Sequence, residues 1–198
     1  MDTTAPHHVF HPAERPGHPL LLLLHGPDGD EEELVAVGRG LLPESALLAP
    51  RGFGVHDGMD GREVEERVVR LERFVDKATI HYGLDPDGVI AVGRSDGASL
   101  AAASLLLHPG LLRAAVMFAP APVLHDPPRP DLTGRSAFIA AGRADRVTDP
   151  LQSERLAADL RRCGADVVLH WHPGEGDAVS GPALDAAQAW LRVRDTAL

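Results

Sequence analysis

The residues best suited to chemistry in this sequence are Gly93-Arg94-Ser95-Asp96-Gly97. An apolar run, Val89–Val92, precedes them, and a run rich in alanine and leucine, Ala98–Leu107, follows. A strand, Gly-x-Ser-x-Gly and a helix in this order are typical of a nucleophile elbow, a sharp turn that exposes a serine hydroxyl above a sheet. In such a turn, side chains at positions 93 and 97 would collide. The alternative is an ordinary glycine-rich turn between a strand and a helix.

The elements that must position this serine alternate along the chain from residue 20 onward. The predicted strands are Leu20–Leu24, Leu47–Ala49, Val89–Val92, Ala114–Phe118, Ala137–Ala141 and Val167–Trp171. The predicted helices are a segment ending near Leu42, Arg62–Tyr82, Ala98–Leu107, Leu151–Cys163 and Pro182–Val193. This alternation predicts an α/β fold with a mostly parallel sheet covered by helices on both faces. Ligands of such sheets bind beyond the carboxyl ends of the strands, where Ser95 and Asp145 are both expected.

A cluster of acids follows the first of these strands: Asp28, Asp30, Glu31, Glu32 and Glu33. Acidic residues in the first turn of a helix interact favourably with the helix dipole, so this cluster predicts a helix start. A cation site is the alternative.

Length and composition fit one domain over residues 1–198, with residues 1–19 as an N-terminal arm or edge hairpin. His7, His8, His11 and His18 lie in this arm, but their spacing matches no standard metal site, and we expect no metal. The net charge of −10 argues against a nucleic-acid partner. A single cysteine, Cys163, and no apolar run long enough to span a membrane predict a cytoplasmic protein. The sequence does not determine the oligomeric state; a homodimer is compatible with it.

Four landmarks stand in one order along the chain: His25-Gly26-x-x-Gly29-Asp30-Glu31, Pro50-Arg51-Gly52, Gly93-x-Ser95-x-Gly97-Ala98 and Gly142-x-x-Asp145. Together they resemble the phospholipase/carboxylesterase group of the α/β-hydrolase superfamily. The resemblance implies an α/β-hydrolase fold, a Ser-Asp-His triad and no cofactor. It also implies hydrolysis of small-molecule esters or thioesters through an acyl-enzyme, with Ser95 as nucleophile and Asp145 as the acid. The N–H of Asp96 would be one oxyanion donor, and the residue after His25-Gly26 would supply the other.

Three positions depart from the pattern of this group. The second donor position is Pro27, which has no N–H. Asp96 stands where relatives usually carry an amide, and a carboxylate beside a developing oxyanion is unfavourable unless Arg94 or Arg143 pairs it. Relatives carry Gly-His in the loop after the last strand, whereas this loop contains Gly176-Asp177.

The missing histidine leaves two histidines after Asp145 in the chain, His170 and His172. They are two residues apart and share a face if the strand persists. His172 is nearer the loop and is the better candidate for the base; a strand-end histidine bonded to backbone is the alternative. His25 is structural in relatives. Asp177 would be a poor base, because a carboxyl pKa of about 4 is badly matched to a serine hydroxyl.

Two functions follow from these observations. The first is a serine hydrolase of small carboxylic esters or thioesters, impaired by the departures at its site. The second is a catalytically inactive binding protein with the α/β-hydrolase fold that lacks the triad histidine.

Overall fold

The structure, a computed structural model, describes residues 6–56, 58–145, 149–173, 179 and 181–195. Seven strands form one sheet in the order β1-β3-β2-β4-β5-β6-β7. The strands are β1 (His8–His11), β2 (Leu20–Leu24), β3 (Ala46–Pro50), β4 (Val89–Arg94), β5 (Ala114–Phe118), β6 (Ser136–Gly142) and β7 (Asp166–His172). All neighbours pair in parallel except β1, which adds an antiparallel edge to β3. The predicted mostly parallel α/β fold is therefore confirmed.

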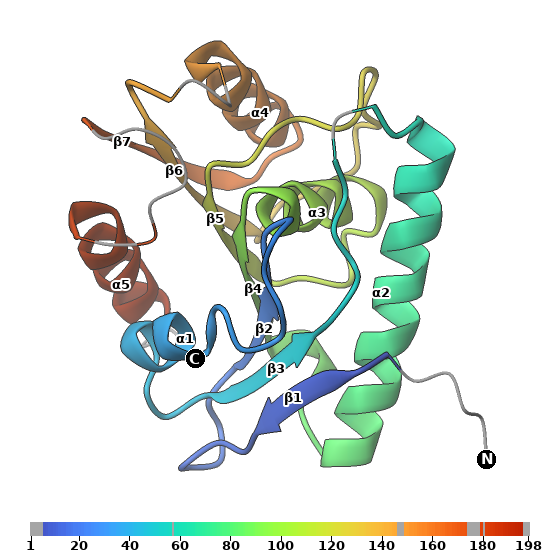
Figure 1. Cartoon of the computed structure of the whole chain (residues 1–198), viewed down its shortest axis with the longest axis vertical. Helices are drawn as coiled ribbons and strands as arrows, with labels where there is room; N and C mark the ends of the chain where they lie inside the picture. The colour runs from blue at the N-terminus through green and yellow to red at the C-terminus, as the bar shows by residue number, and fades with distance from the viewer. Residues whose placement is uncertain (1–5, 57, 146–148, 174–178, 180, 196–198) are drawn as a thin grey trace.

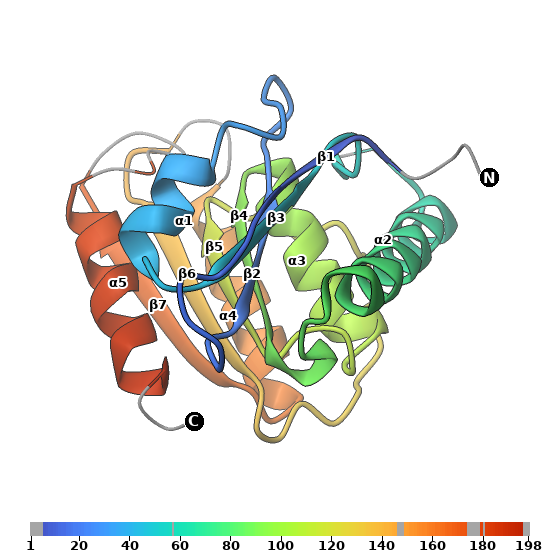
Figure 2. The same ribbon diagram turned by 90° about the horizontal axis from the view of Figure 1, so that it is seen from below.

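Helices cover both faces of this sheet (Figures 1 and 2). One face carries α2 (Gly61–Tyr82), α3 (Asp96–Leu107) and α4 (Pro150–Arg162), and the other carries α1 (Val35–Leu41) and α5 (Pro182–Asp195). A short 3₁₀ turn, Pro86–Gly88, precedes β4. Leu20–Leu24 are buried along the whole of β2, because a central strand between two helical layers is shielded on both sides.

Helix α2 shows how local sequence sets an element's limits. Asp60 accepts a hydrogen bond from the backbone N–H of Glu63, whose own side chain accepts from the N–H of Asp60, which completes a capping box. The helix ends at Gly83, which adopts the left-handed conformation with φ of 66°. The apolar stripe Val64, Val68, Leu71 and Val75 is buried, as its helical spacing predicts.

The segment after β2 departs from the prediction. Residues 31–34 form turns, α1 begins only at Val35, and its first turn contains no acid. The expected helix start at the acid cluster is therefore wrong. Glu31 and Glu33 instead point inward and bind groups from other parts of the chain, which a residue in an exposed first helical turn would not do.

Candidate active site at the carboxyl edge of the sheet

Ser95 occupies a sharp turn between β4 and α3. Strand β4 ends at Arg94, α3 begins at Asp96, and Ser95 between them has φ of 49° and ψ of −116°. A non-glycine residue with this backbone is strained and persists only where its surroundings hold it. The N–H of Ser95 donates to the carbonyl of Phe118 at 2.9 Å, and its carbonyl accepts from the N–H of Ser99 at 2.9 Å. Hydrogen bonds on both sides thus hold the strained turn in place.

The two glycines of the turn leave room for this geometry. A Cβ on Gly93 would lie 2.6 Å from the backbone nitrogen of Ala98, across the turn. A Cβ on Gly97 would lie 2.0 Å from the carbonyl oxygen of Leu24 and 2.7 Å from that of His25. Both contacts are with backbone, so no side-chain movement can relieve them. The predicted requirement for glycine at 93 and 97 is confirmed, and the loop after β2 packs directly against the start of α3.

We expect Gly97→Ala to lower the free energy of unfolding by on the order of 3 kcal/mol, since the new methyl group must displace the backbone at Leu24. Urea unfolding measures the effect. Gly40→Ala is the matched control, because a Cβ there meets nothing within 4 Å and the residue lies in α1. That control should gain about 0.5–1 kcal/mol from helix propensity. Equal stabilities of the two variants would show that the contact at Gly97 is not restrictive.

The loop after β2 lies beside Ser95 because of the order of the strands. The chain moves from β2 outward to β3 and then returns to β4 on the other side of β2. Parallel sheets open a crevice at the carboxyl edge where the strand order reverses in this way. Within this loop, the N–H of Gly29 donates to the carbonyl of Gly26 at 3.2 Å, which places Pro27 at the second position of a β-turn. Pro27 is exposed at the tip of the loop.

Glu33 ties this loop to the elbow. Its carboxylate accepts from the Nε of Arg94 and, at 3.0 Å, from the N–H of Gly26. A Cβ on Gly26 would lie 2.5 Å from the Arg94 guanidinium, so this glycine lets the arginine pass over the loop backbone. Arg94 therefore has an acidic partner in Glu33, while the guanidinium of Arg143 lies 5.2 Å from the centroid of the Trp171 ring.

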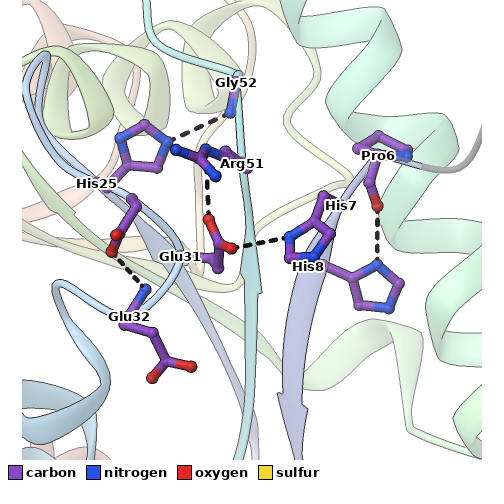
Figure 3. Close-up of polar contacts among 9 residues, drawn as sticks. Pro6, His7, His8, His25, Glu31, Glu32, Arg51 and Gly52 are labelled. Carbon is purple, nitrogen blue, oxygen red and sulfur yellow. Dashed lines mark hydrogen bonds and ion pairs between the residues drawn. The ribbon is translucent and has the colours of Figure 1, made fainter.

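A second polar cluster joins the ends of β1, β2 and β3 (Figure 3). The half-buried His25 donates through Nδ1 to the carbonyl of Gly26 at 2.7 Å and accepts through Nε2 from the N–H of Gly52 at 3.3 Å. The buried Glu31 carboxylate lies 2.8 Å from Nδ1 of His7 and 3.5 Å from Nε of Arg51. Both ring nitrogens of His25 are thus engaged with backbone, which supports its structural role.

Asp96 lies in the crevice itself. A Cβ on Gly54 would lie 3.5 Å from Cβ of Asp96, so the loop after β3 passes over this side chain. Burial raises the pKa of the Asp96 carboxyl above its ordinary value of 3.8. The nearby charges of His56, Arg94 and His25 lower this pKa, and that of Asp28 raises it, but burial has the largest effect. Protonation of Asp96 is therefore easier in the folded protein than in the unfolded chain.

This raised pKa makes stability depend on pH with a defined sign. The folded protein binds the proton of Asp96 more tightly than the unfolded chain does. The contribution of this proton to the free energy of unfolding is therefore full below pH 3.8, and it is lost as the pH rises through the higher pKa of the folded state. We expect Asp96→Asn to be more stable than the wild type at pH 7, with the difference shrinking as pH falls toward 3.8. Urea unfolding at several pH values measures this, with Asp76→Asn, at an exposed position of α2, as the control. A constant difference at every pH would contradict the prediction.

Asp145 lies in the turn after β6, at the same edge as Ser95. Strands β4 and β6 are separated by β5, so two strand spacings, about 10 Å, separate their ends. His172 ends β7, pairs with Gly142 and accepts through its carbonyl from the N–H of Arg143 at 2.9 Å. His172 therefore lies one strand spacing, about 5 Å, from β6, the strand that leads to Asp145. Three strand spacings, about 14 Å, separate His172 from β4.

The side chains of β7 divide between the two faces of the sheet. The ring of His170 stacks on Phe138 at a centroid distance of 5.9 Å, in the layer that α5 covers. His172, two residues on, belongs to the same face and is 7% exposed. Asp177 lies outside the described residues.

Sequence reasoning missed three residues of this site. Glu31 and Glu33 belong to an acid cluster whose helical interpretation hid their inward orientation. His56 lies on the loop after β3 and reaches Asp96 electrostatically, although 40 positions separate them in the chain. The strand order could have indicated this, because β3 and β4 end on either side of β2.

Known proteins of similar sequence and structure agree with this arrangement. No protein-family model matches the chain. The chain is 31% identical over 185 residues to "Putative hydrolase MhqD" of Bacillus subtilis (strain 168), an alignment that covers 87% of this chain and 92% of that protein.

Two solved structures share both the fold and part of the sequence. The carboxylesterase of Bacillus cereus has a TM-score of 0.91 and 28% identity, covering 96% of this chain and 95% of that one. The carboxylesterase from Mesorhizobium loti has a TM-score of 0.87 and 28% identity, covering 97% of each chain. With the strand order and the elbow at Ser95, these similarities show that the chain belongs to the phospholipase/carboxylesterase group of the α/β-hydrolase superfamily.

Proposed function

We propose that this protein hydrolyses carboxylic esters or thioesters of small acyl groups through an acyl-enzyme on Ser95. The observation that carries the proposal is the strained backbone of Ser95, with φ of 49°, at the carboxyl edge of the sheet. A strained non-glycine residue that several hydrogen bonds hold in place is typical of a functional position. Membership in a group of carboxylesterase-type hydrolases supports the same reaction class.

The reaction takes two steps. The Oγ of Ser95 attacks the ester carbonyl carbon while a base removes its proton, and the alcohol or thiol leaves with that proton. Water then attacks the carbonyl carbon of the acyl-serine while the base takes its proton. The bond from this carbon to Oγ breaks, the carboxylic acid leaves, and the base returns the proton to Oγ. The N–H of Asp96, at the first position of α3, would stabilise the negative charge on the carbonyl oxygen in both steps.

In this proposal His172 is the base and Asp145 orients it. The pairing of β6 with β7 supports their association, because His172 lies opposite Gly142, three residues before Asp145. To reach Ser95, the two side chains must extend across the end of β5 toward β4.

We further propose that turnover is slow. Pro27 has no N–H to donate to an oxyanion, and the Asp96 carboxyl would repel one when ionised. The alternative is an inactive binding protein with this fold, which the aspartate at position 177, in place of the family's loop histidine, favours. The two differ in whether any hydrolysis depends on Ser95.

Hydrolysis of p-nitrophenyl butyrate and of butyryl-CoA tests the proposal. We expect saturable turnover of at least one substrate below about 10 s⁻¹, a typical enzyme value, and its loss in Ser95→Ala. Ser104→Ala is the matched control, because the buried Ser104 hydroxyl donates within α3 to the carbonyl of Leu100 at 2.8 Å. Hydrolysis that is equal in the wild type and Ser95→Ala would favour the inactive binding protein.

A further inference from the structure

Residues of the second half of α2 and the start of β1 line a cavity of about 650 Å³. These two elements lie side by side at one edge of the sheet (Figures 1 and 2). Its volume falls within the range of about 300–1,000 Å³ that small-molecule sites occupy. The cavity is distinct from the elbow, although Phe53 lines both this cavity and a small hollow beside Gly97.

The floor of this cavity is aromatic and fixed in shape. The rings of Phe53 and Phe74 lie 5.7 Å apart, and the two residues are 2% and 6% exposed. Tyr82 stacks on Phe10 at a centroid distance of 3.7 Å, and its hydroxyl shares a hydrogen bond of 2.9 Å with Nε2 of His8. Because these rings contact one another, His8 and Phe10, the floor is already formed before any ligand binds.

The rim of the cavity is cationic. Arg70, Arg73 and Lys77 lie three and four positions apart, which places them on one face of α2. The guanidinium of Arg70 lies 5.6 Å from the centroid of the Phe53 ring, over the aromatic floor. Among the described residues that line the cavity, none is acidic. In a chain of net charge −10, this local excess of positive charge would concentrate anions at the cavity.

We propose that this cavity binds a small amphipathic carboxylate, with its apolar chain on the aromatic floor and its carboxylate at Arg70, Arg73 and Lys77. An apolar molecule would gain nothing from the positive charge of the rim, and a compact anion would not cover the aromatic rings. Guanidinium groups bind carboxylates through paired hydrogen bonds, which fixes the orientation of such a ligand. The proposal does not depend on the activity of Ser95.

Isothermal titration with decanoate tests this proposal without any turnover. We expect saturable binding with a Kd on the order of 0.1–1 mM, as the size of the ligand allows. Arg73→Gln should weaken it about tenfold, the value of a hydrogen bond between charged groups. Arg62→Gln is the matched control: it makes the same change at an exposed position of α2 outside the cavity, and it should bind as the wild type does.

The other outcomes each overturn the proposal. Decanol should bind at least tenfold more weakly than decanoate; equal binding would leave an apolar cavity without anion recognition. Inorganic phosphate at the same concentration should not displace decanoate; displacement by phosphate would mean that the cavity binds anions without using the aromatic floor. Equal weakening in Arg73→Gln and Arg62→Gln would mean a diffuse charge effect, and the absence of saturable decanoate binding to the wild type would mean that the cavity is not a site.

Discussion

His172→Ala is expected to lower the turnover of a butyrate ester by about 100- to 10,000-fold, the usual contribution of general acid–base catalysis. Without a base, the serine hydroxyl is a poor nucleophile at neutral pH. His170→Ala is the matched control, because His170 lies on the same strand and stacks on Phe138 under α5. It should change turnover by less than about threefold, well below any catalytic contribution. Single-turnover rates with p-nitrophenyl butyrate measure both variants.

Two further variants separate this assignment from its rivals. His56→Ala removes the imidazole that acts on Asp96 from the loop after β3, and Asp177→Ala removes the carboxylate at the family's histidine position. Neither should affect the rate as His172→Ala does. Full activity in His172→Ala with loss in His56→Ala would assign the base to the loop after β3. Full activity with loss in Asp177→Ala would assign it to a carboxylate.

Pro27→Ala is expected to raise turnover by about 100- to 1,000-fold, since one oxyanion donor is worth that much in other hydrolases. The proposal places the missing donor at Pro27, in a loop that packs against the start of α3. Alanine supplies the N–H, and the exposed β-turn at this position accepts it. The gain should appear in kcat rather than in KM, because the oxyanion forms only after attack.

Pro128→Ala is the matched control for this gain. Pro128 is also exposed, in the loop between β5 and β6, and its replacement should leave kcat unchanged. If Pro27→Ala also leaves kcat unchanged while the wild type turns over the ester, the second donor comes from another group, and proline at position 27 does not impair the site.

Most of the fold could be predicted because its signals are local. The five leucines of β2 and the apolar stripe of α2 mark their elements without reference to the rest of the chain. The elbow could be predicted from its local pattern, Gly-x-Ser-x-Gly between a strand and a helix. The contacts that require glycine at position 93 also lie within the turn. The position of the proposed nucleophile therefore follows from local sequence, whereas the contact of Gly97 with Leu24 is tertiary.

The polar contacts around the elbow could not be predicted, because their partners are distant in sequence. Glu33 binds Arg94, 61 residues away, and Glu31 binds His7 and Arg51 from two different strand ends. The local pattern predicted that these acids lie in the first turn of a helix and interact with its dipole. Ion pairs with distant residues determine their orientation instead. The same holds for the cationic rim on α2, which forms a cavity only because β1 pairs at the edge of the sheet.

Among the described residues, no helix is long and apolar enough to cross a membrane.

The most direct test of the central claim is the intact mass of the protein after incubation with a fluorophosphonate. This reagent reports an activated serine whatever the substrate, because the serine oxygen displaces fluoride from phosphorus. We predict one adduct per chain on the wild type, mapped to Ser95 by peptide sequencing, and none on Ser95→Ala. Unfolding the protein in urea before incubation should also abolish labelling. A folded wild type that stays unmodified under conditions that label a known serine esterase would contradict the acyl-enzyme on Ser95.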